Sequence, residues 1–173
     1  DHKKPYGARY ILADQVGLGK TIQLAMAAQL MALYGDKPIL IIVPKTLIWQ
    51  WQDEMNSLLD MPSAVWDGKS WVDEEGHEYI GRGIKKCPRR VGIISQGLIV
   101  ANSKIIDGLL EQEYECVIVD EAHRARRKNL GEGKEDHSPN PNNLYRFLLG
   151  ISIKTKSMLL ATATPIQDRK SVV

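Results

Sequence analysis

The sequence has little cysteine and almost no net charge. Its two cysteines, Cys87 and Cys116, lie far apart, and neither has a second Cys or a His at metal-ligand spacing. This excludes a cysteine-based metal site of the usual spacing and favours a reducing, intracellular setting. The 23 Lys and Arg residues nearly balance the 21 Asp and Glu residues, which leaves a net charge of +2. That charge does not by itself indicate a nucleic-acid partner, so such a partner must be argued from local patches.

Long apolar runs, a leader-like beginning and internal repeats are also absent. The longest apolar runs fall well short of the roughly 18 residues that a membrane-spanning helix needs. The opening residues, Asp1 to Pro5, do not form a signal peptide. The composition, with 43% apolar and 25% charged residues, is ordinary for a soluble globular protein. A length of 173 residues suits one domain with its own core.

The sequence does contain a series of short, continuous apolar runs rich in β-branched residues. They are Tyr10–Ala13, with Arg9 leading into it, Ile39–Val43, Val91–Ile94, Cys116–Val119 and Met158–Ala161. Such runs are typical of strands buried on both faces of a parallel sheet. Their position predicts a buried thiol for Cys116, whereas the basic, polar surroundings of Cys87 predict an exposed one.

Helical segments separate most of these runs. Helices are predicted over residues 21–34, which Gly35 is well placed to end, over 45–59, and over 96–112 as one or two shorter helices. Strands that alternate with helices predict βαβ units in a doubly wound, three-layer α/β fold with a mainly parallel sheet. Residues 67–90 and 129–143 interrupt this rhythm and are predicted to be surface loops.

A phosphate-binding loop is indicated directly after the first predicted strand. It consists of Asp14, Gln15, Val16, Gly17, Leu18, Gly19, Lys20 and Thr21. Its glycines let backbone N–H groups approach phosphate oxygens, and the helix that it opens adds a partial positive charge. In this interpretation Lys20 binds the β- and γ-phosphates of ATP, and the Thr21 hydroxyl completes the Mg²⁺ shell. The strict pattern has Gly in place of Asp14, so the alternative is a glycine-rich turn that binds nothing.

Two carboxylates follow the fourth apolar run. Asp120 and Glu121 stand at the end of a predicted buried strand, where ligands gather in a parallel α/β sheet. Asp120 is therefore predicted to reach the Mg²⁺, and Glu121 to orient and activate the attacking water. The alternative is that this pair only caps a helix N-terminus.

Coupling between the nucleotide site and a neighbouring strand is predicted for His123, Thr162 and Thr164. The two threonines follow the last apolar run, where their hydroxyls are placed to contact His123 or the acidic pair. The alternatives are a hydrogen-bonded surface histidine and a Thr-Pro strand end that only turns the chain.

Together these segments resemble the Swi/Snf-related ATPases of helicase superfamily two. The resemblance is carried by residues 14–21, by Ile41–Pro44 followed by Leu47–Trp51, by Asp120–Arg124 and by Thr162–Gln167, and it runs from about residue 10 to 168. Val16 and Ala163 bring the chain closer to a distant bacterial branch of the family. Gln15 and Asp168 stand where the family usually has Glu and Asn, but neither is an expected phosphate ligand.

The resemblance implies that residues 1–173 form a RecA-like P-loop NTPase fold, the first of two such domains in a helicase-like motor. Family members couple the hydrolysis of Mg–ATP to translocation along duplex DNA, generally without separating the strands. The resemblance implies a second RecA-like domain, which supplies an arginine finger and half of the DNA track, and we expect it to lie outside residues 1–173. The chain begins and ends abruptly against strong motifs, so we expect an excised fragment that hydrolyses ATP poorly alone.

If the chain is part of such a motor, phosphate contacts are expected just after two predicted strands. The residues concerned are Pro44, Lys45, Thr46, Ser95 and Gln96. Backbone amides and hydroxyls at such ends suit phosphate oxygens and carry no sequence information. The basic run from Arg124 to Lys128 fits contact with DNA or the missing domain, but equally a solvated surface. Trp49 and Trp51 suit base stacking, although their helical setting favours packing.

Three functions are compatible with these motifs. The first is a duplex-DNA translocase or remodeller of protein–DNA complexes. The second is a strand-separating DNA or RNA helicase, or a restriction-system motor subunit. The third is a nucleotide-sensing docking module without activity, against which the intact set of Lys20, Thr21, Asp120 and Glu121 argues.

Overall fold

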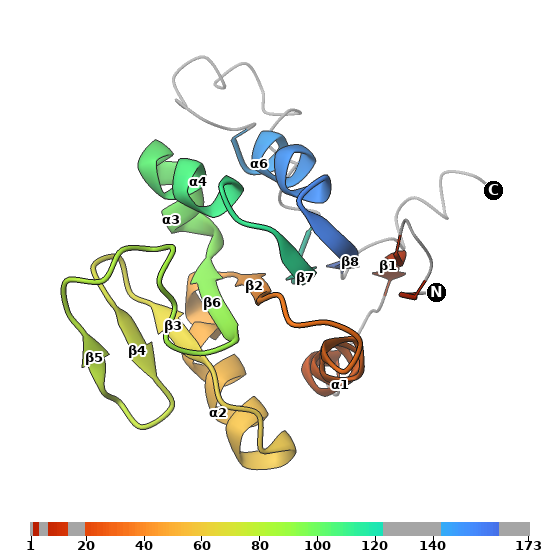
Figure 1. The fold of residues 1–173 in the computed structure, drawn as a ribbon, viewed down its shortest axis with the longest axis horizontal. Coiled ribbons are helices and arrows are strands. Elements are labelled where there is room, and N and C mark those ends of the chain that lie inside the picture. The colour runs from red at the N-terminus through yellow and green to blue at the C-terminus, as the bar shows by residue number, and fades with distance from the viewer. Residues whose placement is uncertain (1, 4–6, 14–19, 123–142, 163–173) are drawn as a thin grey trace.

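The strands of this protein form one mixed sheet. The structure is a computed structural model of the 173-residue chain, and it describes residues 2–3, 7–13, 20–122 and 143–162. Within these residues the sheet has the order β1-β8-β7-β2-β6-β3-β4-β5 (Figure 1). The strands are β1 (Arg9–Ala13), β2 (Ile39–Val43), β3 (Ala64–Trp66), β4 (Trp71–Asp73), β5 (Glu78–Tyr79), β6 (Val91–Ser95), β7 (Tyr114–Val119) and β8 (Thr155–Thr162).

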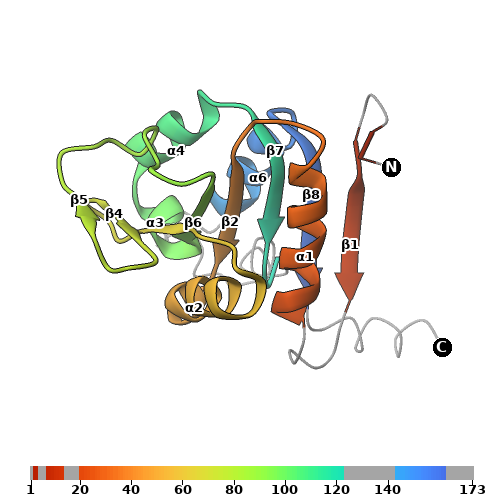
Figure 2. The same ribbon diagram turned by 60° about the horizontal axis from the view of Figure 1, so that its bottom comes forward.

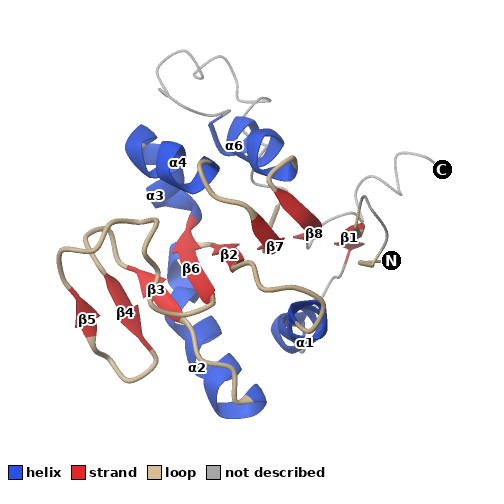
Figure 3. Ribbon diagram, viewed as in Figure 1, coloured by secondary structure: helices blue, strands red, loops and turns tan. Residues whose placement is uncertain are grey.

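Helices cover both faces of this sheet. They are α1 (Lys20–Ala32), the 3-10 turn η1 (Lys45–Leu47), α2 (Ile48–Leu59), α3 (Gln96–Ala101), α4 (Ser103–Leu110) and α6 (Asn143–Ser152). Helices α1 and α2 lie on one side of the sheet, and α3, α4 and α6 lie on the other, as the helix and strand colours of Figure 3 show. The predicted three-layer arrangement is therefore confirmed.

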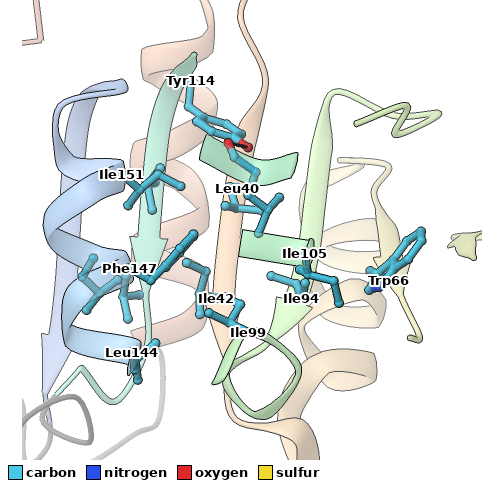
Figure 4. Close-up of a cluster of buried hydrophobic side chains, with 14 of the residues drawn as sticks. Leu40, Ile42, Trp66, Ile94, Ile99, Ile105, Tyr114, Leu144, Phe147 and Ile151 are labelled. Carbon is cyan, nitrogen blue, oxygen red and sulfur yellow. Dashed lines mark hydrogen bonds between the residues drawn. The ribbon is translucent and has the colours of Figure 1, made fainter. Parts of the chain in front are cut away.

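The alternation of side chains along the central strands creates the two cores. In β2, Ile39, Ile41 and Val43 pack with α1 and α2, whereas Leu40 and Ile42 pack with α3, α4 and α6. Figure 4 shows the second of these clusters, to which α6 contributes its apolar side chains. Burying each such aliphatic side chain contributes about 2 kcal/mol. The sheet therefore forms a rigid base for residues that follow its strands.

Parallel pairing brings the carboxyl ends of the central strands to one edge. In the order β1-β8-β7-β2-β6-β3, each strand is parallel to the next. In Figure 2 the arrowheads of β1, β2 and β7 accordingly point in the same direction. The register places Ala13 opposite Thr162 and Ile42 opposite Val119, so the segments that leave these strands start side by side.

The predicted strands and helices agree with the structure. The five predicted strands correspond to β1, β2, β6, β7 and β8, of which β7 and β8 begin earlier than predicted, at Tyr114 and Thr155. The helix predicted over 21–34 corresponds to α1, which ends at Ala32 and not at Gly35 as predicted. The helix predicted over 45–59 corresponds to η1 with α2, and residues 96–112 contain the two short helices α3 and α4. A Cβ at Gly35 would overlap the Glu115 carboxylate, so a close approach requires this glycine just after α1.

The prediction that residues 67–90 form a surface loop is wrong in part. Strands β4 and β5 lie in this segment and extend the sheet by antiparallel pairing beyond β3. The physical reason is burial: Trp71 is 1% exposed, and its ring contacts that of Trp66 edge to face. The predicted loop at 129–143 lies outside the described residues, apart from Asn143, which opens α6.

The carboxylate of Asp73 holds the antiparallel extension together. It accepts hydrogen bonds from the backbone N–H groups of Glu75 (2.9 Å) and His77 (3.0 Å) and from the Tyr79 hydroxyl (2.9 Å). The Arg89 guanidinium donates a further bond at 3.1 Å. Burial opposes ionisation, but the N–H groups of His77 and Glu75 together with Tyr79 and Arg89 hold the pKa of Asp73 below its ordinary value.

Both cysteines are free thiols. Cys116 is buried as predicted, and burial raises the pKa of its thiol to about 12. Cys87, predicted to be exposed, is partly buried against the α3–α4–α6 core, and burial raises its pKa to about 11. Neither thiol therefore ionises readily near neutral pH. In the part of the chain that the structure describes, no helix is long and apolar enough to cross a membrane.

Candidate functional site

A buried ion pair joins two segments that leave the sheet at the same edge. Lys20 opens α1, and Asp120 directly follows β7. The ammonium nitrogen Nζ of Lys20 lies 3.0 Å from Oδ1 of Asp120, and the side chains are 7% and 3% exposed. The structure thus brings together two residues that the sequence assigns to one nucleotide site. The loop between β1 and α1, comprising Asp14, Gln15, Val16, Gly17, Leu18 and Gly19, lies outside the described residues.

Three further contacts fix Asp120. Its Oδ2 accepts a long hydrogen bond of 3.4 Å from the indole N–H of Trp51, and its backbone carbonyl accepts one of 2.7 Å from the Gln96 side chain. Its own N–H donates to the carbonyl of Ile42 at 2.8 Å, which continues the pairing of β7 with β2. Asp120 is therefore held by α1, α2, α3 and β2 at once.

The Oδ1 atom of Asp120 has an unused capacity to bind a cation. It is buried and accepts no hydrogen bond from the described residues, so the charge of Lys20 alone compensates it. Mg²⁺ prefers carboxylate and hydroxyl oxygens, and it is usually held by one or two carboxylates together with phosphate oxygens. Asp120, with the partly buried Thr21 beside Lys20, fits this donor set. Among the described residues no group of three or more His, Cys, Asp or Glu side chains forms a metal site that is independent of phosphate.

The residue after Asp120 has an unusual backbone. Glu121 has a φ of 55°, in the left-handed region that non-glycine residues rarely adopt. The next N–H, of Ala122, donates to the carbonyl of Ala161 in β8 at 2.7 Å. The hydrogen bonds of β7 to both neighbouring strands therefore continue past Val119, to β2 at Asp120 and to β8 at Ala122. Thr162 ends β8 and is partly exposed, whereas His123 and Thr164, the other two residues expected to take part in coupling, lie outside the described residues.

The residues expected to contact nucleic acid differ in exposure. Pro44 is buried at the end of β2, whereas Lys45 and Thr46 in η1 are exposed at the same edge of the sheet as Asp120. Ser95 is 2% exposed and caps α3 by accepting a hydrogen bond from the Leu98 N–H. The side chain of Gln96, 4% exposed, is bonded to Asp120. Only Lys45 and Thr46 thus present free surface here, and the basic run from 124 to 128 lies outside the described residues.

The two tryptophans of α2 have different environments. Trp51 is 1% exposed, which confirms packing for that residue, and Trp49 is 48% exposed. Trp49 and Lys45 line an open hollow of about 380 Å³ together with Trp66 and Leu98. The contacts of Trp51 and Gln96 with Asp120 were not predicted. The position of Gln96 directly after a strand end is the one signal in the sequence that relates it to this edge.

Comparison with known proteins identifies the family. The sequence matches the family model described as the SNF2-related domain over residues 5–172, nearly its whole length. The chain belongs to the SNF2-related domain family. This SNF2-related domain is 31% identical over 166 residues to the RNA polymerase-associated protein RapA of Vibrio vulnificus, and 30% identical over 167 residues to that of Actinobacillus pleuropneumoniae. These alignments cover 94% and 92% of the domain but only 16% of either relative, so it spans about a sixth of their length.

Solved structures of similar fold agree with this assignment. The SNF2-related domain superposes on a Sulfolobus solfataricus SWI2/SNF2 ATPase core in complex with dsDNA with a TM-score of 0.61, at 19% identity. The match covers 92% of this chain and 28% of that one. A second structure, of the Sulfolobus solfataricus SWI2/SNF2 ATPase core domain, gives a TM-score of 0.59 at 20% identity, over 94% of this chain and 28% of that one. The expected three-layer, mainly parallel RecA-like fold is therefore confirmed.

Proposed function

We propose that this SNF2-related domain is the ATP-binding half of a motor that couples ATP hydrolysis to translocation on duplex DNA or to remodelling of protein–DNA complexes. The observation that carries the proposal is the buried contact of Lys20 with Asp120 at the carboxyl edge of the sheet. This contact joins Lys20, the lysine of the phosphate-loop sequence, to Asp120, the first carboxylate of the acidic pair. A docking module has no need to bury this charged pair, which costs several kcal/mol of desolvation per ion.

Nucleotide binding is assigned to the start of α1 and the segment before it. The backbone N–H groups of residues 14–19 and the N-terminus of α1 attract phosphate oxygens, and Lys20 binds the β- and γ-phosphates. Thr21 and Asp120 would hold Mg²⁺, which would supply positive charge to neutralise the phosphate oxygens during hydrolysis.

Hydrolysis is assigned to Glu121. Its carboxylate orients a water molecule whose oxygen attacks the γ-phosphorus, while the bond from that phosphorus to the β–γ bridging oxygen breaks, giving ADP and phosphate. His123, Thr162 and Thr164 relay the state of the nucleotide to the neighbouring strand. The left-handed backbone at Glu121 supports a special role for this position, because such conformations concentrate at functional sites.

DNA binding is assigned to the exposed Lys45 and Thr46 at the same edge, which suit phosphate contacts without sequence preference. The similarity to a core solved with dsDNA supports a duplex partner. Residues 1–173 are proposed to be the first RecA-like domain, and a second, outside this chain, to supply an arginine finger. An intracellular location follows from a DNA substrate.

The decisive experiment measures ATP hydrolysis by the longer protein that contains this domain. Duplex DNA, single-stranded DNA and RNA are supplied separately, and Glu121→Gln is the control because it keeps the size of the side chain but removes its charge. Strong stimulation by duplex DNA that is lost in Glu121→Gln supports the proposal. Stimulation by single strands or RNA alone favours a strand-separating helicase, and no stimulation at all favours a docking module.

A further inference from the structure

We propose that Trp51 and Gln96 are positioning residues for the metal-binding carboxylate of Asp120. The inference rests on the function proposed for Asp120 and extends it to two residues that touch neither nucleotide nor metal. Both side chains are buried, at 1% and 4% exposure, and both donate a hydrogen bond to Asp120. They come from different helices, α2 and α3, and act on different parts of the same residue.

The indole of Trp51 fixes the plane of the carboxylate. The terminal torsion of an aspartate is broad, so the orientation of its two oxygens is set by the groups that contact them. Trp51 Nε1 lies 3.4 Å from Oδ2, and Lys20 Nζ lies 3.0 Å from Oδ1. With the indole N–H at Oδ2 and the ammonium charge of Lys20 at Oδ1, Oδ1 is held on the side of α1. Loss of the indole N–H frees the carboxylate to rotate.

The amide of Gln96 fixes the backbone at the same point. Its Nε2 lies 2.7 Å from the carbonyl oxygen of Asp120, which belongs to the peptide that joins Asp120 to Glu121. This peptide precedes the left-handed residue Glu121, where regular strand pairing is interrupted. Gln96 therefore supplies the hydrogen bond to Asp120 that a neighbouring strand provides elsewhere, and it orients both members of the acidic pair.

The two helices also begin next to the segments expected to contact nucleic acid. Helix α2 follows Lys45–Leu47, and Gln96 directly follows Ser95 at the end of β6. The hydrogen bond from Trp51 thus connects α2 with the Asp120 carboxylate, and the bond from Gln96 connects α3 with the Asp120 backbone carbonyl. Groups that orient a metal ligand commonly change metal affinity by about 10-fold or more when they are removed.

The test measures metal binding in the full-length protein, with Mn²⁺ as the spectroscopic probe. Electron paramagnetic resonance gives the Kd of Mn²⁺ in the presence of ADP for wild type, Trp51→Phe and Gln96→Met. We expect Kd to rise on the order of 10-fold in each variant, while ADP binding without metal stays unchanged. The Mg²⁺ concentration that gives half-maximal ATP hydrolysis should rise in parallel in both variants, with kcat at saturating Mg²⁺ largely retained in Trp51→Phe.

Trp71→Phe is the matched control. Trp71 is also 1% exposed, and its indole N–H also donates one hydrogen bond, to the carbonyl of Gly83 at 3.2 Å, but it lies in the other core. Its Mn²⁺ Kd should equal that of wild type. The inference is overturned if Trp51→Phe and Gln96→Met bind Mn²⁺ like wild type, or if Trp71→Phe weakens binding as much as they do. Should Trp51→Phe not fold, Gln96→Met decides the question alone.

The proposed function has separate readouts. Loss of DNA-stimulated hydrolysis in Glu121→Gln supports it whatever Mn²⁺ affinity the two positioning variants show. If Asp120→Asn binds Mn²⁺ as tightly as wild type, the metal role of Asp120 is wrong, and the positioning role of Trp51 and Gln96 is overturned with it.

Discussion

The ammonium nitrogen of Lys20 lies 3.0 Å from Oδ1 of Asp120, although the two residues are far apart in the chain and both are almost fully buried. We expect Lys20→Ala to abolish nucleotide binding, because the β- and γ-phosphates lose their cation. It should also lower the free energy of unfolding by about 3 kcal/mol, since it leaves the Asp120 charge buried without a partner. Calorimetry with ATP and urea unfolding measure the two effects.

The double variant Lys20→Ala/Asp120→Asn separates these effects. It should regain most of the lost stability, because no unpaired charge remains, but not the nucleotide binding. An unchanged ATP affinity in folded Lys20→Ala contradicts the assignment of the phosphate loop.

The isolated 173-residue chain should bind Mg–ATP weakly and hydrolyse it poorly. The expected reason is that the γ-phosphate lacks the arginine of a second RecA-like domain. Steady-state ATPase assays of the chain with and without duplex DNA, set beside the longer protein, test this. Robust DNA-stimulated turnover by residues 1–173 alone would show that the site is complete without a second domain.

Lys45→Ala should weaken binding of the longer protein to duplex DNA of any sequence. Loss of one phosphate contact reduces the slope of log K against log salt concentration by about 0.9. Fluorescence anisotropy over a series of salt concentrations gives that slope. Lys37→Ala is the control, because Lys37 is exposed near the amino end of β2, at the opposite edge of the sheet. An equal loss in both variants would indicate a general charge effect instead of a contact by Lys45.

Asp73→Asn should lower the free energy of unfolding by about 2 kcal/mol at pH 7, because hydrogen bonds to an ionised group are replaced by neutral ones. The pKa of Asp73 in the folded state lies below its ordinary value of 3.8. The contribution is therefore fully present above that pH and disappears as the pH falls through the folded pKa. Urea unfolding of both proteins at pH 7 and pH 3 should show a difference that shrinks in acid. A pH-independent difference would contradict this role of the ionised carboxylate.

Gly35→Ala should destabilise the chain by roughly 1–3 kcal/mol, because the added Cβ overlaps the Glu115 carboxylate and forces the surroundings to move. Gly97→Ala is its control: nothing lies within 4 Å of a Cβ at that position in α3. That change should be neutral or stabilising by about 0.5 kcal/mol, since Ala favours helix over Gly. Thermal unfolding of both variants tests the contrast.

The sequence predicted the central strands well because each is a continuous apolar run. Ile39–Val43 is buried at all five positions, and a run this short and this rich in β-branched residues favours a central strand covered on both faces. The position of Asp120 could be anticipated for the same reason, since a residue that follows one parallel strand lies near those that follow the others. The distance between Asp120 and Lys20 could not be anticipated, because that distance depends on how α1 packs against β7.

Other elements escaped prediction for different reasons. Strands β4 and β5 contain three and two residues, too few to show any periodicity. They are stabilised by the contact of Trp71 with Trp66 of β3 and by the hydrogen bond of Asp73 with Tyr79 of β5. Helix α6 did carry a signal. Its buried residues have helical spacing and are Leu144, Phe147, Leu148 and Ile151. The inward orientation of the Gln96 side chain had no signal in the sequence. A glutamine that follows a strand can point into solvent as readily as toward Asp120.

The backbone at Glu121 has an evolutionary consequence. A φ of 55° costs an ordinary L-residue roughly 1 kcal/mol, which Gly or Asn largely avoids. If selection acted on folding stability alone, it would thus favour Glu121→Gly. That substitution removes the carboxylate proposed to act on water. Stability and chemistry therefore oppose each other at Glu121. In related proteins that are no longer selected for ATP hydrolysis, Glu121 should be among the first residues to be replaced.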